Sequence, residues 1–525
     1  MVTADVDLLR LLEARDRELE ELSKTVEMLR EDNERLGERL KTLLNALYGR
    51  KSERIAPGQL DLFTKLLSAA EVAPEPAPSP DSAPAREPAP KRRSRKGHGR
   101  NGFPAHLPRL VTELDLPEGE RTCPDCGVGM RCIGEESCER GHVVPAQILV
   151  HRYVRKKYAC PAGHAMKTAE APAALIERCK YEPSVYAHIA VAKYSDHLPL
   201  HRQSEIFKRY GIDLPKSTMW DMLGRVDELV SQPVLERMRA ELLLEKIIQA
   251  DETPVTVRLE GGKGTQQSYV WVYRAGAKIA FDFRMGRDRD GPNKYLALWQ
   301  GILQGDGYSG YDEITRRNCL TRAGCWAHAR RKVKVALDLK SPEAARLMVP
   351  IQRLFRLEST LKRRAEARGY SREEYLEHRS TLRRRRSASL LAEIDALIVE
   401  LKGQRAVLPK GPLGKAIGYI ENQREPLGVF VNEPRLEIDN NQAENALRPI
   451  AVGRKNWLVF GSPRGGAVAC RLYSLVLSCR AAGLNPELYL EAVLRAVATT
   501  PATEIASLTP WAWAEAHPEH RLPSD

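Results

Sequence analysis

The stretch that decides the fold is Ile247-Ile248-Gln249-Ala250-Asp251-Glu252-Thr253-Pro254-Val255-Thr256-Val257. Apolar and β-branched residues flank one acidic pair without a helical period, which predicts a buried strand. A carboxylate inside a core strand is costly to desolvate unless a cation or a hydrogen-bond donor lies beside it. Taken alone, Asp251 is best interpreted as an acid held by backbone N–H groups for structural reasons. Two later segments favour a functional role instead.

Each of these segments carries a further carboxylate. Asp306 follows a short strand that runs into a glycine turn. Glu444 lies in a short helix that Asp439 is predicted to cap, with Gln442 completing a capping box and Pro449 limiting the helix. Two strand-borne Asp and one helix-borne Glu predict a two-metal phosphoryl-transfer site. Mg²⁺ or Mn²⁺ prefers carboxylate oxygen, and in-line attack on phosphate uses two ions about 3.5–4 Å apart.

Length and charge restrict the class of protein. The chain has 525 residues, a formal net charge of +13 and a pI near 9.2. That excess of positive charge indicates an acidic polymer as partner, with nucleic acid the first candidate. No window approaches the apolar length of a membrane span, and the N-terminus does not resemble a signal peptide, so we expect a cytoplasmic protein with no membrane partner. Ten cysteines fit a reducing compartment and a metal site better than a disulfide framework.

The N-terminal segment keeps a heptad repeat from Leu8 to Leu47, with mostly Leu at both core positions. Such a repeat predicts a coiled coil. Asn33 at a single core position favours a parallel, in-register dimer, because its amide finds a partner only when it is aligned with its copy. Arg15 and Gly37 weaken the seam, which leaves an amphipathic helix folded back on its own chain as the alternative.

A linker follows the predicted coiled coil. Residues 73–90 alternate Ala, Pro, Glu, Ser and Asp, and residues 91–100 form a basic run. The first part predicts a semi-extended chain. The basic run is interpreted either as a solvated tail or as a source of phosphate contacts without sequence readout.

Four metal-ligating residues come next, in a Cys-x2-Cys pair and a Cys-x3-His pair: Cys123, Cys126, Cys160 and His164. Their types and spacing predict one closed, tetrahedral, structural Zn²⁺ site. An alternating segment at 147–158 is predicted to be a strand that returns the second pair beside the first, which is a zinc-ribbon pattern. Cys132 and Cys138 are competing ligands, or reduced core thiols.

Three helices are predicted after the zinc ribbon, over 184–194, 201–210 and 217–230, with Ser217 or Thr218 as the cap of the third. The short turn containing Gly211 makes the last two resemble a helix-turn-helix. The third helix is not especially basic, so a plain helical connector remains an equal alternative.

A mixed sheet is predicted to surround the first carboxylate. After the Asp251 strand come a hairpin at 269–274 and 278–284, a helix at 293–300, the Asp306 strand and a fifth strand at 323–327. Carboxylates on the first and fourth strands match a ribonuclease-H-like order. An Arg-rich helical block from 329 to about 422 separates the second and third carboxylates, so the sheet is predicted to carry a helical insertion. Two amphipathic helices, 471–482 and 486–498, follow the third carboxylate.

These features together resemble the transposases of the insertion-sequence-66 family, a group of DDE transposases, over nearly the whole chain. The matching motifs are Gln249-Ala250-Asp251-Glu252-Thr253-Pro254, Gly305-Asp306-Gly307-Tyr308, Gly324-Cys325-Trp326-Ala327-His328-Ala329-Arg330-Arg331-Lys332, Ile438-Asp439-Asn440-Asn441-Gln442-Ala443-Glu444, Gly453-Arg454-Lys455-Asn456-Trp457-Leu458 and His197-Leu198-Pro199-Leu200-His201-Arg202. The resemblance implies that Asp251, Asp306 and Glu444 are the acidic triad. The family's second zinc pair is commonly Cys-x2-Cys, whereas this chain has Cys160-x3-His164.

The chemistry expected of the triad is metal-dependent cleavage and joining of DNA. Two Mg²⁺ or Mn²⁺ ions would activate water for hydrolysis at the element end, and then the freed 3′-OH for attack on target DNA. Phosphate contact and ordinary surface pairing are the two interpretations of five basic residues: His328, Arg330, Arg448, Arg454 and Lys455. Trp326 and Trp457 are better interpreted as core residues than as stacking platforms for an unpaired base.

The sequence therefore predicts a multidomain α+β protein. The predicted parts are a coiled-coil arm (1–50), a Pro-rich and basic linker (51–105), a zinc ribbon (106–180), a helix-turn-helix-like segment (181–240), a ribonuclease-H-like α/β core (241–333), a helical insertion (334–430), the rest of the core (431–470), and C-terminal helices with a tail (471–525). The resemblance implies a bacterial, nucleoid-associated enzyme. Its partners would be the element's terminal repeats, target DNA, further copies of the chain and possible accessory proteins of the element. The alternatives are a metal-dependent nuclease or resolvase on the same fold, and a catalytically dead DNA-binding regulator.

Overall fold

The computed structural model describes residues 180–523 except 263 and 406, residues 148–159 and 166–168, and scattered positions between 15 and 37. The chain forms two compact units, residues 73–169 and residues 1–72 with 170–525. In the smaller unit, β1 (Lys157–Ala159) pairs antiparallel with β2 (Met166–Thr168). The predicted zinc ligands lie outside the described residues, as do Cys132, Cys138 and the basic run at 91–100.

The described positions of the N-terminal arm are helical. Three apolar residues of the predicted coiled-coil seam are among them, and all three are exposed in the single chain: Leu22 (59%), Val26 (43%) and Leu36 (58%). Apolar seam residues of this kind are buried when two helices supercoil. These three residues are thus available to a second helix, and the parallel dimer stays a prediction.

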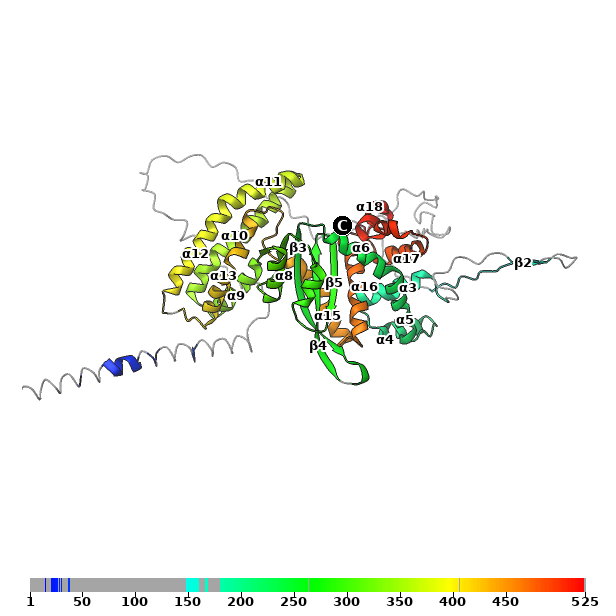
Figure 1. Ribbon diagram of the computed structural model, residues 1–525, viewed down its shortest axis with the longest axis horizontal. Coiled ribbons are helices and arrows are strands. Elements are labelled where there is room, and N and C mark those ends of the chain that lie inside the picture. Colours follow the sequence, from blue (N-terminus) through cyan, green and yellow to red (C-terminus); the bar gives the residue numbers. More distant parts are fainter. Residues whose placement is uncertain are drawn as a thin grey trace, which may run out of the picture. The chain divides into compact units, whose positions relative to one another are not determined.

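One mixed sheet of five strands forms the centre of the larger unit (Figure 1). Its order is β5-β4-β3-β6-β7; β3 pairs antiparallel with β4 and parallel with β6. The strands are β3 (Ile247–Arg258), β4 (Thr265–Ala275), β5 (Lys278–Arg284), β6 (Ile302–Gln304) and β7 (Thr321–Ala323). The hairpin turns at Gly276 with φ of 59°, a conformation that glycine adopts at little cost. The mixed sheet was predicted, but the fifth strand ends at Ala323 rather than continuing to residue 327, because Trp326 already begins a helix.

The two faces of β3 have different neighbours. Ile248 and Ala250 pack with Trp271 and Tyr273 in an apolar cluster. This cluster includes side chains of α7 (Asp290–Leu296) and α8 (Asp312–Asn318). The helix predicted at 293–300 is α7, which begins earlier and stops at Leu296, because Ala297 has a positive φ of 49°. The opposite face of β3 carries Asp251, since successive side chains alternate across a strand.

The free edge of β5 is covered by α16 (Pro463–Ala481). The N–H groups of Ile279 and Phe281 donate to the hydroxyls of Ser478 (3.1 Å) and Ser474 (2.8 Å). Both serines are buried. Covering an edge in this way satisfies backbone donors that would otherwise be available to another strand.

The predicted helix-turn-helix-like segment is helical and packs on the C-terminal helices. The first two predicted helices are correct to within one residue, but the third ends at Val226 and continues through a π-helical turn at Asp227–Ser231. The buried Asp227 is held by two bonds of 2.6 Å from Arg471 of α16, a contact that local sequence does not reveal. The N-cap of the third helix is Pro215, so the prediction of Ser217 or Thr218 as its cap was wrong. The helices are α3 (Pro183–Tyr194), α4 (Leu200–Arg209), α5 (Lys216–Val226), α6 (Gln232–Leu242), α17 (Pro486–Ala496) and α18 (Pro510–Ala516).

The predicted helical insertion is present, and its helices lie on one side of the sheet (Figure 1). They build an apolar core that also includes Ile302 of β6 and Ala323 of β7. The helices of the insertion are α9 (Trp326–Asp338), α10 (Pro342–Arg368), α11 (Arg372–Leu382), α12 (Ala388–Lys402), α13 (Pro412–Asn422) and α14 (Arg424–Gly428), with a π-helical turn at Arg383–Ser387. Within the four-arginine run, Arg383 is fully buried while Arg384, Arg385 and Arg386 are exposed. Among the described residues, no helix combines the length and apolarity needed to cross a bilayer.

Candidate active site

The first two carboxylates lie at equivalent positions of neighbouring parallel strands. Gln249 of β3 is in register with Gln304 of β6. Asp251 and Asp306 each follow two residues later, and residues two apart in a strand point to the same face. Asp306 sits just beyond the strand end, where its Oδ1 accepts the N–H of Tyr308 at 3.0 Å. The register of the two strands and the electrostatic effect of Asp306 on Asp251 indicate that these two carboxylates lie near each other.

The two register-matched glutamines connect the sheet to the third carboxylate. Both are buried. Nε2 of Gln249 donates to Oε1 of Gln304 (2.9 Å) and to the carbonyl of Asp439 (3.2 Å), while Nε2 of Gln304 donates to the carbonyl of Glu437 (2.7 Å). The side chain of Asn440 adds a bond to the carbonyl of Ala250 (3.0 Å). The role of the two glutamines was not predicted, although the repeated Gln-x-Asp pattern at 249–251 and 304–306 was a signal for it.

The third carboxylate is carried by α15 (Asn441–Trp457), with Glu444 in its first turn. Asp439 does not cap this helix; its carboxylate accepts from the N–H (3.1 Å) and the side-chain amide (2.8 Å) of Asn441. The helix also continues through Pro449, contrary to the prediction. The reason is a buried stripe that continues past the proline and packs against β3 and β4: Ala443, Ala446, Leu447, Ile450 and Gly453.

The other two carboxylates of the proposed triad act electrostatically on Asp251. Burial raises the pKa of Asp251 to about 8, and the charges of Glu252, Asp306 and Glu444 add to the increase. The N–H of Glu252, which donates to Asp251 at 2.9 Å, opposes it. A buried carboxyl group whose pKa is raised by neighbouring carboxylates marks a place where a cation is favourable.

Glu252 itself belongs to the opposite face of β3, where it meets a cation. Nε of Arg287 donates to its Oε1 at 2.9 Å, and the hydroxyl of Tyr311 donates to its other oxygen at 3.4 Å. Burial raises the pKa of Glu252, and the bond from Arg287 works against that rise. The second acid of the Asp-Glu pair therefore has a cationic partner, whereas Asp251 has none in the part of the chain that the structure describes.

Glu444 is paired with an arginine that the sequence analysis did not single out. Nη2 of Arg331 lies 2.6 Å from both carboxylate oxygens of Glu444. His328 lies one turn earlier on α9, with Nδ1 3.6 Å from Oε1 of Glu444. Burial and then the charge of Arg331 lower the pKa of His328. The Sγ of Cys325 accepts the N–H of Asn440 at 3.2 Å. Cys325, His328 and Glu444 each offer a possible metal-ligand atom, and these atoms lie within 4.8 Å of one another.

The other predicted DNA-contact residues have varied surroundings. The guanidinium of Arg330 lies 4.6 Å from the ring centroid of Phe355. Arg454 donates to the carbonyl of Pro254 at 2.5 Å, while Arg448 and Lys455 are exposed on α15. Because they are exposed, Arg448 and Lys455 can reach a phosphate backbone.

Trp326 and Trp457 have different surroundings in the structure. Trp326 is a core residue, as predicted, since it is 2% exposed and donates its Nε1–H to the carbonyl of Leu427 at 2.9 Å. Trp457 is half-buried and stacks on Phe460 with ring centroids 4.5 Å apart. It also lines a cavity, described below.

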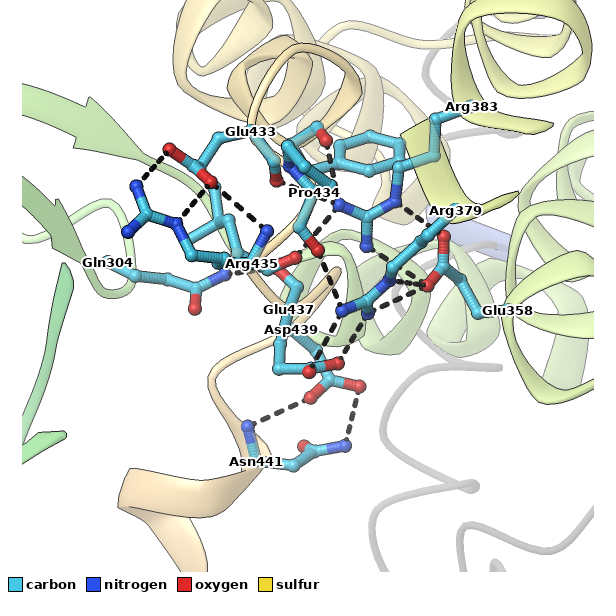
Figure 2. A network of polar contacts seen from close by, with 12 residues as sticks. Gln304, Glu358, Arg379, Arg383, Glu433, Pro434, Arg435, Glu437, Asp439 and Asn441 are labelled. Atoms are coloured by element: carbon cyan, nitrogen blue, oxygen red, sulfur yellow. Dashed lines mark hydrogen bonds and ion pairs between the residues drawn. The ribbon is translucent and has the colours of Figure 1, made fainter. Parts of the chain in front are cut away.

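A buried charge network from the insertion holds the segment that leads into α15 (Figure 2). Arg379 donates to Glu358 (2.8 Å) and to Glu437 (2.7 Å). Arg383 donates to both oxygens of Glu358 (2.7 and 3.0 Å). Its Nη1 also bonds three main-chain carbonyls, those of Phe430 (2.8 Å), Glu433 (3.0 Å) and Leu436 (2.9 Å). Glu444 is therefore positioned from two sides, by the glutamines of the sheet and by the arginines of the insertion.

Comparison with known families matches four successive parts of the chain. Residues 178–468 match the model described as Transposase IS66 family, and residues 474–511 match the IS66 C-terminal element. Residues 120–162 match the zinc-finger binding domain of transposase IS66, which supports a zinc ion in that part of the chain. Residues 35–111 match Transposase C of IS166 homeodomain. The zinc-finger match contains three of the four predicted ligands and ends two residues before His164.

Curated relatives are similar over most of their length. The uncharacterized protein y4qI of Sinorhizobium fredii (strain NBRC 101917 / NGR234) is 32% identical over 493 residues, covering 90% of this chain and 87% of the relative. The uncharacterized protein y4hP of the same strain is 30% identical over 507 residues, covering 91% and 88%. The uncharacterized protein y4jD is 31% identical over 442 residues, covering 80% and 84%.

Proposed function

The chain belongs to the transposase IS66 family, and from that premise we propose that it cuts and joins DNA through Asp251, Asp306 and Glu444. The observation that carries the proposal is the equivalent register of the two aspartates, combined with the action of the Glu444 charge on Asp251. The strand order β5-β4-β3-β6-β7, with a helix-borne acid added after an insertion, supports a ribonuclease-H-like core.

The donor set fits hard divalent cations. All three groups are carboxylates, and two of them belong to neighbouring strands, Asp251 within β3 and Asp306 just after β6, which suits Mg²⁺ or Mn²⁺. Bound ions would supply charge stabilisation at phosphorus and activation of the attacking oxygen. Asp251, whose raised pKa keeps a proton on it near neutral pH, must release that proton when it becomes a ligand. Glu444 must exchange its pairing with Arg331 for the ion.

The DNA-binding parts are proposed on separate grounds. The match to a zinc-finger domain supports DNA binding by the zinc-containing part, and we assign its ligands to Cys123, Cys126, Cys160 and His164. The α4–α5 pair would add a helix-turn-helix-like contact, and exposed Arg448 and Lys455 would contact phosphates beside the triad. The exposed heptad seam would join two copies of the chain.

The test is a cleavage and strand-transfer assay on DNA that carries the ends of the parent element, with Mg²⁺ or Mn²⁺. The wild type should give joined products, while Glu444→Gln should give none and still bind DNA. Glu425→Gln is the matched control, because Glu425 is an exposed acid on α14, and it should behave as the wild type. Equal joining by Glu444→Gln would refute the assignment of the third carboxylate.

Two other outcomes would assign the alternative functions. Cleavage without joining in both metals would make the chain a metal-dependent nuclease. Specific end binding without cleavage, with the element's accessory proteins present, would make it a DNA-binding regulator.

A further inference from the structure

A cavity of about 320 Å³ lies beside the C-terminal end of α15. Its volume is at the lower end of the range for small-ligand sites, about 300–1,000 Å³. Its walls come from α3, α4, α5, α15, α16 and the connection between α15 and α16. Five of its twelve lining residues are aromatic: Tyr194, Trp220, Trp457, Phe460 and Tyr473. Flat apolar walls of this kind suit a planar aromatic ligand.

The same cavity contains a cation without an acidic partner. Lys193 of α3 lines it, and its Nζ lies 5.7 Å from the ring centroid of Tyr194. Among the described residues, no carboxylate pairs with Lys193. Burial alone lowers the pKa of this lysine to about 8. A largely buried cation of this kind favours an anionic ligand that would neutralise it.

Two elements, β3 and α15, connect the acidic triad to the cavity. Phe460, at the cavity, extends the edge of β3: its N–H donates to the carbonyl of Thr256 (2.8 Å), and its carbonyl accepts the N–H of Arg258 (2.9 Å). Asp251 precedes Val257, which pairs with Phe460, by six residues on β3, a separation of about 20 Å at roughly 3.3 Å per residue. Along α15, Glu444 precedes Trp457 by thirteen residues, again about 20 Å at roughly 1.5 Å per residue.

We propose that this cavity holds one unpaired nucleotide of the bound DNA, with its base among the aromatic rings and its phosphate against Lys193. The proposal rests on the proposed function, because it requires DNA along β3 and α15. A duplex advances about 3.4 Å per step on each strand. The unpaired nucleotide is thus expected about six steps from the phosphate at the triad, given the separation of about 20 Å.

The test scans single mismatches along the end fragment and measures the affinity of the full chain for each duplex. A mismatch removes part of the cost of unpairing, so at one position, about six steps from the cleaved phosphate, it should tighten binding roughly tenfold. Mismatches at other positions should leave affinity unchanged or weaken it. An abasic nucleotide at the sensitive position should remove the gain, because no base is left to stack.

Variants then assign the effect to the cavity. Trp220→Leu should abolish the position-specific gain and Trp220→Phe should keep part of it, which separates lost stacking from misfolding. Lys193→Met should weaken binding and reduce the salt dependence by about one phosphate contact. Lys402→Met is the control, since Lys402 is exposed on α12 and paired with Glu421, and it should keep the gain.

Each failure points to a different claim. If the wild type joins DNA ends but no mismatch tightens binding, the cavity assignment is wrong and the proposed function stands. A gain that survives both Trp220→Leu and Lys193→Met would also overturn the assignment. If the wild type neither cuts nor joins DNA, the proposed function fails, while a gain that depends on Trp220 would still support the cavity.

Discussion

Replacing Arg383 with methionine perturbs the network that holds the segment before α15. Its side chain is fully buried and makes five hydrogen bonds, two to Glu358 and three to main-chain carbonyls. Burial would raise the pKa of Glu358, but bonds from Arg383 and the charges of both arginines bring it below its ordinary value. Glu358 is therefore a buried charge that depends on its partners.

The expected loss of unfolding free energy follows from the partners that Glu358 keeps after Arg383→Met. Breaking a buried ion pair by removing one partner costs about 3–5 kcal/mol. Glu358 keeps its bond to Arg379, which places the expected loss of unfolding free energy near the lower end, at about 3 kcal/mol. That is a large fraction of a typical domain stability of about 5–15 kcal/mol. The segment 430–440 should therefore open more often than in the wild type.

The assay is amide hydrogen exchange of segment 430–440, combined with urea unfolding. Arg383→Met should speed exchange in this segment, and turnover on saturating DNA should fall while DNA affinity is kept, because Glu444 loses its positioning. Arg384→Met is the control: Arg384 is the exposed neighbour in the same π-helical turn and should change stability by no more than about 0.5 kcal/mol. If both variants lose the same stability, the positioning role of Arg383 is refuted.

Three further predictions concern other contacts. The raised pKa of Asp251, about 8, means that Mg²⁺ displaces a proton below that pH; the Mg²⁺ needed for half-maximal cleavage should fall as pH rises towards 8, and a flat profile would contradict the assignment. Ser474→Ala should cost about 1–3 kcal/mol in urea unfolding, because the N–H of Phe281 loses its acceptor; a neutral result would show that water replaces it. The His188–Glu487 hydrogen bond raises the pKa of His188 and lowers that of Glu487, so its contribution is present between their ordinary values of 4.5 and 6.5 and is lost above the raised value of His188 and below the lowered value of Glu487. Glu487→Gln should therefore destabilise the protein in that window by less than about 1 kcal/mol, both side chains being half exposed, and an equal loss at alkaline pH would contradict this origin.

Local pattern was sufficient to predict the sheet and the position of its acids. The β-branched run around Asp251, the glycine turn at Gly276 and the strand before Asp306 all carry signals within a few residues of themselves. The end of α15 was predicted wrongly for an equally physical reason. A proline usually limits a helix, but a buried stripe that packs on β3 and β4 extends this one past Pro449.

The partners of the third carboxylate were beyond local pattern. Arg331 meets Glu444 across 113 residues, and Arg383 meets Glu358 across 25. In the sequence, Arg383 is indistinguishable from Arg384, its exposed neighbour in the basic run. What distinguishes Arg383 is its set of tertiary partners, Glu358 of α10 and the main-chain carbonyls of Phe430, Glu433 and Leu436. Long-range pairing of this kind depends on the tertiary structure rather than on residue type.

The most direct test of the acidic site replaces Asp306 with cysteine and compares strand transfer in Mg²⁺ and in Mn²⁺. A thiolate is a poor ligand for the hard Mg²⁺ ion and a better one for Mn²⁺. If Asp306 holds the ion, Asp306→Cys should be inactive in Mg²⁺ and partly active in Mn²⁺, with DNA binding unchanged. Wild-type activity of this variant in Mg²⁺, or equal loss in both metals while DNA binding is kept, would contradict a metal contact at Asp306.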